Sequence, residues 1–293
     1  MDTIAFHQVK KSLGDFKLDI PSLDIKKGYI TGFIGENGAG KTTTIKLILD
    51  MLIADEGKIQ IFGMDTRKNS DSIKEEIGYV GETAGYPEES KIKVIKNMIA
   101  PFYKNWDEKL FTKYMQNFRI NIDKKYGEFS AGQKKQFAIA MALAHRPKLI
   151  LLDEPTTNLD PVVRNEILEM LMEHMQNEEV TVFYSTHITS DLEKAADYIV
   201  YIKQGEILIN QEREELLRNY SVVKGPKNLL DKEIKKYLLG YRQTSLGFEA
   251  LLSDKKVAEQ IFGTEVRYVT PTIEDIMLFL GQKGEGMQYE TYR

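Results

Sequence analysis

The sequence predicts an α/β fold with a phosphate-binding core, followed by a small C-terminal α+β unit. A glycine-rich loop stands between an apolar strand at residues 29–34 and an amphipathic helix. A second apolar run, residues 149–152, ends in two carboxylates, as strands buried on both faces of a parallel sheet do. Strand and helix patterns then alternate to about residue 217.

Length and composition exclude several classes of protein. The 293 residues are enough for one large domain, or for a main domain with an appendage. With 40 basic and 44 acidic residues, the net charge of −4 gives no global positive field for nucleic acid. The absence of cysteine excludes a disulfide framework and a cysteine metal site. We expect no signal peptide, and no run approaches the ~18 apolar residues of a spanning helix.

The N-terminal segment predicts a β-hairpin that leads into the first core strand. Residues 1–25 alternate apolar and polar side chains, with a turn at Leu13-Gly14-Asp15.

The loop after that strand predicts a nucleotide site. Gly35, Gly38 and Gly40 let the backbone curl until its N–H groups point at phosphate oxygens, while Lys41 adds charge and Thr42 offers a hydroxyl to Mg²⁺. The apolar residues of the next helix share one face by their spacing: Ile45, Ile48, Leu49 and Leu52. The alternative is a glycine-rich turn without a ligand.

The acidic pair predicts metal binding and proton transfer. Asp153 and Glu154 emerge at the C-terminal edge of a strand, where α/β sheets place their ligands. Asp153 can hold Mg²⁺, and Glu154 can accept a proton from the water that attacks a γ-phosphate. A solvated acidic turn remains the alternative.

A second phosphate cradle precedes this strand. The turn Phe129-Ser130-Ala131-Gly132-Gln133 opens a helix, and small turns of this kind can receive phosphate. The helix that follows places four residues on one face: Phe137, Ala140, Met141 and Ala144. Since one γ-phosphate cannot easily use both cradles of a single subunit, we expect two subunits arranged head to tail.

These motifs together resemble the nucleotide-binding subunit of an ATP-binding cassette (ABC) transporter. Residues 35–43 are similar to the family's Walker A segment, 129–133 to its LSGGQ signature and 149–154 to its Walker B strand. Residues 158–160 match its D-loop, and His187 its switch histidine. The resemblance covers about residues 1–217 and implies a RecA-like core with an antiparallel β subdomain and a helical signature subdomain.

The resemblance implies that ATP is held between the Walker A segment of one subunit and the signature of another. Lys41 would bind the β- and γ-phosphates, Glu154 would be the general base, and His187 would reach the γ-phosphate. Thr42 and Asp153 would hold Mg²⁺. The residues implied to bind ATP are Gly35, Glu36, Asn37, Gly38, Ala39, Gly40, Lys41, Thr42, Thr43, Ser130, Ala131, Gly132, Gln133 and Asp160, the last linking the two sites across the interface.

Three positions depart from the family pattern. Ala131 replaces the first signature glycine, which is harmless if its φ is negative, as we expect. Glu82 stands where the family has a glutamine that contacts Mg²⁺ and senses the membrane partner; its carboxylate can still ligate the cation but adds negative charge. For adenine, the position of the family's aromatic residue holds Leu13, and Phe16 follows three residues later, so either can serve the base.

Domain boundaries follow from these patterns. We expect an ATPase domain at residues 1–217, with a helical subdomain at about 84–146, and an accessory domain at 218–293. A break in periodicity at 221–228 marks the boundary, and residues 271–280 predict a helix near the C-terminus.

The resemblance also implies a membrane partner. It places the surface for a coupling helix at about residues 84–104. The aromatic-rich stretch in and beside it contains Tyr86, Pro87, Phe102, Tyr103 and Trp106, which suit an interface or alternatively the core of the helical subdomain.

The function predicted from these residues is a cytoplasmic ATPase subunit that dimerises on ATP and drives a separate transmembrane permease from the membrane's cytoplasmic face. The second copy is identical or homologous. The segment 270–275 before the last helix is similar to ABC-2-type exporter subunits, which favours export of peptides, toxins or drugs. Two alternatives stay open: a non-transport ABC ATPase acting on ribosomes or nucleic acid, and a nucleotide-gated scaffold without turnover.

Overall fold

The computed structural model describes residues 2–83, 85–175 and 179–281. The chain divides into two compact units, one up to Asn210 and one from Gln211 onward. The predicted boundary after Leu217 stays a prediction. Met1, Ala84 and the last twelve residues of the predicted accessory domain, 282–293, lie outside the described residues.

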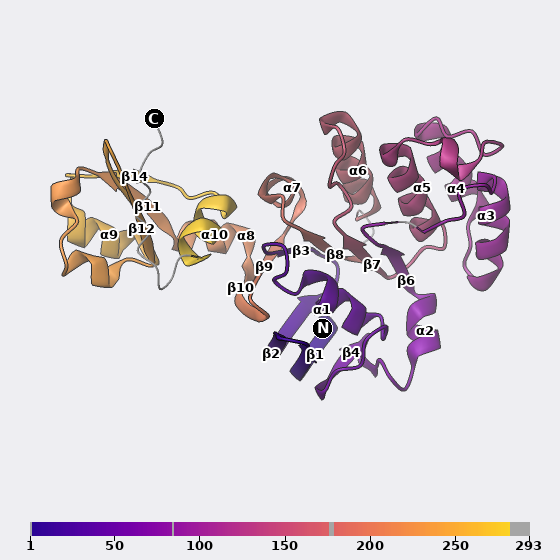
Figure 1. Cartoon of the computed structure of the whole chain (residues 1–293), viewed down its shortest axis with the longest axis horizontal. Helices are drawn as coiled ribbons and strands as arrows, with labels where there is room; N and C mark the ends of the chain where they lie inside the picture. Colours follow the sequence, from indigo (N-terminus) through magenta and orange to yellow (C-terminus); the bar gives the residue numbers. More distant parts are fainter. Residues whose placement is uncertain (1, 84, 176–178, 282–293) are drawn as a thin grey trace. The chain divides into compact units, whose positions relative to one another are not determined.

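The first unit is built on one large mixed sheet. Its strands are β1 (Asp2–Leu13), β2 (Phe16–Lys26), β3 (Ile30–Ile34), β4 (Glu56–Ile61), β5 (Met64–Asp65), β6 (Ile77–Val80), β7 (Leu149–Asp153), β8 (Thr181–Thr186), β9 (Tyr198–Lys203) and β10 (Glu206–Glu212). Among the described residues this 10-stranded sheet has the order β5-β4-β1-β2-β10-β9-β3-β8-β7-β6 (Figure 1).

The sheet has an antiparallel part and a parallel part. The predicted N-terminal hairpin is confirmed: β1 pairs antiparallel with β2 and its register closes at Leu13 opposite Phe16. In the parallel part, β6 pairs with β7, β7 with β8, β8 with β3 and β3 with β9, each pair parallel. Every residue of β3, β7 and β8 is buried, as the apolar runs predict for strands covered on both faces.

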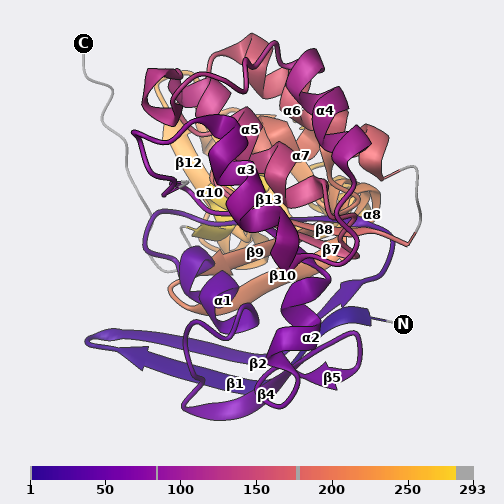
Figure 2. The same cartoon turned by 90° about the vertical axis from the view of Figure 1, so that its right-hand side faces the viewer.

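Seven helices accompany these strands in the described part of the first unit. They are α1 (Lys41–Ile48), α2 (Ser70–Glu75), α3 (Ile92–Ile99), α4 (Glu108–Asn117), α5 (Ala131–Leu143), α6 (Pro161–His174) and α7 (Thr189–Ala195), with short 3₁₀ turns at Ala100–Phe102 and Tyr126–Glu128. Helices α3 to α6 lie on one side of strands β6 to β8, and α1 lies on the other with the antiparallel strands (Figures 1 and 2).

Helix α1 is shorter than its apolar spacing predicts. It ends at Ile48, whereas the predicted apolar face continues to Leu52. The chain turns at Asp50, whose φ is 53°. Leu49 is nevertheless buried and Leu52 packs against the same core, so the apolar residues fulfil their role without the last helical turn.

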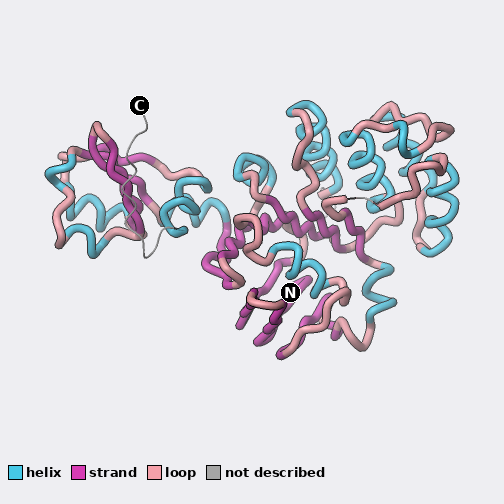
Figure 3. The backbone as a smooth tube through the Cα atoms, in the orientation of Figure 1, coloured by secondary structure: helices cyan, strands magenta, loops and turns pink. Residues whose placement is uncertain are grey.

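The second unit is an α+β unit with its own sheet (Figure 3). Its elements are α8 (Arg213–Asn219), β11 (Ser221–Gly225), β12 (Gly240–Thr244), β13 (Gly247–Leu252), α9 (Lys255–Phe262), β14 (Arg267–Val269) and α10 (Ile273–Gly281), with 3₁₀ turns at Lys227–Leu229 and Ile234–Tyr237. The helix predicted at residues 271–280 is therefore confirmed.

The break in periodicity predicted at residues 221–228 is wrong for their first part. Ser221–Gly225 forms β11, which lies inside the sheet order β12-β13-β11-β14. The branched Val222 and Val223 are buried on opposite faces, and pairing on both sides outweighs the following Gly-Pro sequence. Gly240 at the start of β12 allows α10 to pack closely on this sheet, since a Cβ there would lie 2.4 Å from the Phe279 carbonyl oxygen.

Candidate functional site

The parallel sheet brings the predicted motifs to one edge. Ile34 at the end of β3 pairs with Thr186 of β8, and Asp153 at the end of β7 pairs with Ser185. Val80, the last residue of β6, pairs with Leu152. The segments that follow these strands therefore start side by side, at the edge where α/β sheets bind their ligands.

The glycine-rich loop connects β3 to α1 in the predicted way. Gly38 and Gly40 have φ values of 81° and 113°, which only glycine adopts without strain. Gly35 is needed for space, because a Cβ there would lie 2.5 Å from the Ile202 carbonyl oxygen. Gly40 begins α1 without a side-chain cap, so the first backbone N–H groups of the helix face the loop's interior as donors for an anion.

Lys41 reaches back over this loop. Its side chain is 7% exposed, and Nζ donates to the carbonyl oxygens of Gly35 at 2.8 Å and Glu36 at 3.3 Å. The same nitrogen lies 3.3 Å from Glu154 Oε1. Lys41 thus joins the phosphate loop to the acidic pair at the end of β7.

Asp153 and Thr42 form the candidate metal position. The Thr42 hydroxyl donates to Asp153 Oδ2 at 2.9 Å. Asp153 Oδ1 is buried and makes no hydrogen bond within the described part of the chain, so one carboxylate oxygen remains available. Burial raises the pKa of Asp153, the Thr42 and Ser185 hydroxyls oppose this rise, and the charges of Glu154 and Glu82 add to it.

Glu154 is held between three polar groups. Its Oε2 accepts a hydrogen bond from the Thr157 hydroxyl at 2.8 Å and lies 2.9 Å from His187 Nδ1. Burial would raise the pKa of Glu154, but the hydrogen bonds from His187 and Thr157 and the charge of Lys41 bring it below its ordinary value. The carboxylate is therefore ionised at neutral pH. His187 itself is partly exposed, which leaves its ring accessible from solvent.

Glu82 follows β6 and has an exposed side chain. Its charge is close enough to Asp153 to act on the pKa of that carboxyl. Its backbone carbonyl accepts a hydrogen bond from Lys135 Nζ at 2.9 Å. The structure thus places Glu82 near the acidic pair, as the candidate metal role requires.

The signature turn begins α5 and caps it. The Ser130 hydroxyl accepts from the Gln133 backbone N–H at 3.2 Å, and the Gln133 side chain accepts from the Ser130 N–H at 3.2 Å. Ala131 is the first helical residue and has a negative φ, so the expectation about its conformation is confirmed. Gly132 packs closely on α6, where a Cβ would lie 3.3 Å from Val163 Cγ1.

Asp160 likewise caps a helix. Its Oδ1 accepts from the backbone N–H groups of Val162 and Val163 at 3.0 and 3.1 Å, at the start of α6. Its side chain is exposed. Among the described residues, neither Asp160 nor the signature turn is hydrogen-bonded to the phosphate loop, and the predicted contact across an interface stays a prediction.

The two adenine candidates differ in position. Leu13 lies at the tip of the hairpin and is 41% exposed. Phe16 lies against the phosphate loop, since a Cβ on Gly40 would be 3.0 Å from Phe16 Cζ. The ring of Phe16 is therefore the better placed of the two.

The aromatic residues of the stretch predicted for a coupling surface line different parts of the structure. A groove of about 360 Å³ runs between the helices and the core, with Met51, Tyr79, Tyr86, Ile99 and Tyr103 among its lining residues. Tyr86 also packs edge-on against the Tyr126 and Phe137 rings, which agrees with the alternative that it belongs to the helical core.

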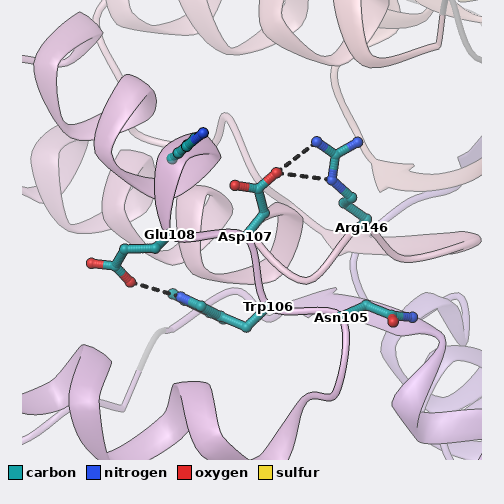
Figure 4. Close-up of a pocket in the computed structure, with 6 residues that line it drawn as sticks. Asn105, Trp106, Asp107, Glu108 and Arg146 are labelled. Carbon is teal, nitrogen blue, oxygen red and sulfur yellow. Dashed lines mark hydrogen bonds and ion pairs between the residues drawn. The ribbon is translucent and has the colours of Figure 1, made fainter.

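Trp106 does not line this groove. It lines a separate pocket, shown in Figure 4, where its Nε1 donates to Glu108 Oε2 at 2.9 Å. Arg146 closes the other side by donating to Asp107 Oδ2 through two nitrogens, at 3.0 and 2.6 Å. Phe102 is 80% exposed. Trp106 therefore lies apart from Tyr86 and Tyr103, and the coupling surface at about residues 84–104 stays a prediction.

Sequence reasoning missed three groups of polar residues at or beside the site. Thr157 donates to Glu154, and Lys135 donates to the loop after β6. Thr156, which follows Glu154 by two residues, forms a buried hydrogen-bonded cluster with Tyr184 and Asp191. Their positions next to the recognised motifs were the signal that the sequence offered.

The described residues contain neither a membrane-spanning helix nor a metal site made of acidic and histidine side chains alone. None of the helices in the described part of the chain combines the length and apolar character needed to cross a bilayer. In the same residues, no cluster of three or more histidine, aspartate or glutamate side chains is arranged to hold a metal ion alone. A metal position here would need hydroxyl and phosphate oxygens as well.

Comparison with known proteins agrees with this geometry. The family described as "ABC transporter" matches residues 18–157. The chain is 30% identical over 218 residues to the ABC transporter ATP-binding protein YtrB of Bacillus subtilis, covering 74% of each chain. It is 35% identical over 196 residues to the bacitracin transport ATP-binding protein BcrA of Bacillus licheniformis, covering 65% of this chain and 63% of that protein.

A solved structure shares the fold. The ATP-binding subunit of an ABC transporter superposes with a TM-score of 0.67 at 24% identity, covering 74% of this chain and 92% of that one. The predicted α/β fold is thereby confirmed.

Proposed function

This chain belongs to the ABC transporter ATP-binding proteins, and from that premise we propose that it dimerises on ATP and hydrolyses it to power a separate transmembrane permease. ATP binding and hydrolysis are the activity of the family. The proposal concerns the residues that perform it here, the partner and the cargo. The observation that supports it best is the meeting of Lys41, Asp153, Glu154 and His187 at one sheet edge.

We assign phosphate binding to the loop from Gly35 to Thr43. Its backbone N–H groups and the N-terminus of α1 provide donors, and Lys41 provides a positive charge for the β- and γ-phosphates. Phe16, which lies against Gly40, is our candidate for stacking on adenine.

The residues at the end of β7 fit a hard divalent cation. Asp153 offers a buried oxygen without a hydrogen-bond partner in the described part of the chain, and Thr42 offers a hydroxyl beside it. Glu82 is the third candidate ligand. Mg²⁺ bound by these oxygens and by ATP would neutralise charge on the phosphate oxygens.

Glu154 is the proposed general base. Its ionised carboxylate can accept a proton from the attacking water, and His187 and Thr157 fix its orientation through Oε2. Oε1, which lies next to Lys41, is the oxygen nearer to the phosphate loop.

The second subunit completes the site in this proposal. Ser130, Ala131, Gly132 and Gln133 would cover the γ-phosphate bound by the opposite copy, and Asp160 would lie at the interface between the copies. Ser130, Ala131 and Asp160 are exposed, which leaves them accessible to a partner. The second copy is identical or homologous to the first.

The groove lined by Tyr79, Tyr86 and Tyr103 is our candidate surface for the permease. Through this contact the subunit would act at the cytoplasmic face of the membrane, and we infer no direct nucleic-acid partner. Similarity to a bacitracin transport protein supports export of peptides, toxins or drugs over an action on ribosomes. The groove is apolar and aromatic, as surfaces that bind a partner helix are.

The proposal is tested with Glu154→Gln, which keeps the shape of the side chain and removes the base. We expect turnover to fall ~10²-fold or more while ATP still binds. With ATP and Mg²⁺ the variant should run as a dimer in size-exclusion chromatography with light scattering. Unchanged turnover would show that the base is misassigned, and a variant that stays monomeric with ATP, alone and with its permease, would contradict the shared site.

A further inference from the structure

We propose that Lys135 is a positioning residue that forms a functional pair with Glu82. Its charge offsets the carboxylate of Glu82 beside the nucleotide, and its hydrogen bonds fix the segment after β6 to the signature helix. The inference rests on the proposed function in one respect, that ATP and its metal ion bind at this sheet edge.

The contacts of Lys135 are directed at a single segment. Lys135 lies on α5 and is 8% exposed, which is unusual for a lysine. Its Nζ donates to the carbonyl oxygens of Gly81 at 3.0 Å and Glu82 at 2.9 Å. A buried ammonium group requires such acceptors, because an unpartnered charge in the interior is costly. Both acceptors belong to the residues that leave the nucleotide edge of the sheet.

The charges around Lys135 show why a cation is useful there. Three carboxylates act on it, those of Glu82, Asp153 and Glu154. Lys41 is shared between Glu154 and two backbone carbonyls of the phosphate loop. Without Lys135, a triphosphate would approach three carboxylates and one lysine. Lys135 brings a second positive charge into this region, where a glutamate stands instead of the expected glutamine.

Burial and these carboxylates have opposite effects on Lys135. Burial lowers the pKa of Lys135, and the charges of Glu82, Asp153 and Glu154 oppose this shift in part. The same groups that Lys135 offsets also stabilise its charge, so the pair is mutually dependent.

The hydrogen bonds from Lys135 to Gly81 and Glu82 also connect the helix of the signature turn to the edge of the sheet that carries the phosphate loop. The signature turn occupies residues 130–133 at the start of α5, and Lys135 lies in the first turns of the same helix. Further along α5, Gly78 of β6 allows close packing, since a Cβ there would lie 2.5 Å from the Ala142 carbonyl oxygen. Just after the helix, His145 Nε2 lies 3.1 Å from the Ile77 carbonyl oxygen. Helix α5 is thus attached to β6 at both ends, and Lys135 provides the attachment nearest to the nucleotide.

A double-mutant cycle tests the charge balance. Lys135→Gln removes the charge but keeps an amide that can donate to a carbonyl, and Glu82→Gln removes the opposing charge. We expect Lys135→Gln to weaken equilibrium binding of Mg·ATP, followed with a fluorescent ATP analogue, by about tenfold. The double variant should recover to within about threefold of the parent.

Controls separate this inference from the proposed function. Lys134→Gln changes the neighbouring lysine, which pairs with Glu88 at 2.9 Å, and should leave binding unchanged. Lys41→Ala tests the site itself, and unaltered binding there would refute the proposed function rather than the pair. Melting temperatures without nucleotide show whether each variant folds. Lys135→Arg, which keeps the positive charge, should retain Mg·ATP binding.

Two results would overturn the pairing. One is a double variant that binds Mg·ATP as weakly as Lys135→Gln alone, which would leave Lys135 with only a structural role. The other is unchanged binding by Lys135→Gln in a folded protein.

Discussion

Removing one buried hydroxyl, in Tyr184→Phe, tests whether a hydrogen-bonded cluster fixes the catalytic edge. Tyr184 OH donates to Asp191 Oδ2 at 2.7 Å and lies 2.9 Å from the Thr156 hydroxyl. The Thr156 hydroxyl donates to the same Asp191 oxygen at 2.5 Å. All three residues are buried, and they connect β8, α7 and the segment after the acidic pair. The pKa of Tyr184 is raised, first by burial and then by the charge of Asp191, so its hydroxyl stays a donor.

The expected loss of stability follows from these contacts. A hydrogen bond to a charged acceptor contributes about 1.5–3 kcal/mol. After the substitution Asp191 keeps its bond from Thr156, and Arg164 Nε lies 3.8 Å from its other oxygen, so the carboxylate is not left alone. We therefore expect a loss of about 2 kcal/mol. For a unit of this size that corresponds to a melting temperature lower by about 4–8 °C.

Tyr201→Phe provides a matched control. Tyr201 lies on β9 and is 1% exposed, but its hydroxyl has no hydrogen-bond partner among the described residues. Burial, helped by the charge of Glu36, raises the pKa of Tyr201 to about 12, so this phenol is also neutral. Removing an unpaired buried hydroxyl leaves no acceptor stranded, and the melting temperature should stay the same or rise.

The assay is thermal unfolding without nucleotide, followed by circular dichroism, for the parent and both variants. The difference between the two variants measures the hydrogen bonds, because both substitutions remove one hydroxyl from a buried tyrosine on a neighbouring part of the same sheet. Equal shifts for Tyr184→Phe and Tyr201→Phe would refute the reasoning, since packing alone would then explain both.

Two other predictions concern ligand and pH. Lys41→Ala should abolish the rise in melting temperature that ATP produces. In the parent, ATP at a hundred times its Kd should stabilise the folded state by about 2.7 kcal/mol. An equal rise in the variant would contradict the role of Lys41. Burial lowers the pKa of His145, while backbone acceptors at Ile77 and Met141 oppose this. The unfolded chain therefore binds a proton that the folded chain refuses, and stability should fall as pH drops below about 6.5. His145→Gln should flatten this fall without abolishing it, because burial also lowers the pKa of His174. Denaturant titrations at several pH values measure how the free energy of unfolding depends on pH. A dependence unchanged by His145→Gln would contradict the role of His145.

Much of the candidate site could be predicted because each motif has a local cause. The positive φ of Gly38 and Gly40 requires glycine whatever the rest of the chain does. The apolar run of β7 identifies a buried strand, and the parallel register then brings Asp153 next to the ends of β3 and β8. Local pattern and long-range pairing agree at these positions, so the sequence was sufficient.

The remaining features depend on the surroundings of a residue. Lys134 and Lys135 are adjacent and look alike in sequence, but Lys134 pairs with Glu88 at the surface while Lys135 is buried against Gly81 and Glu82. Helix periodicity does not show which of them faces β6. The end of α1 and the strand Ser221–Gly225 were also misjudged, because a turn at Asp50 and pairing with two neighbouring strands outweigh local preference.

The cluster of Thr156, Tyr184 and Asp191 explains how Glu154 and His187 meet. Thr156 follows Glu154 by two residues, and Tyr184 precedes His187 by three on β8. Since both hydroxyls bond the same Asp191 oxygen, the two segments that carry the proposed base and the proposed switch histidine are fixed to one buried point. Glu154 has a φ of 49°, a strained value for a residue with a side chain, and needs such support. The cluster thus supports both segments between which the 2.9 Å hydrogen bond of Glu154 and His187 forms.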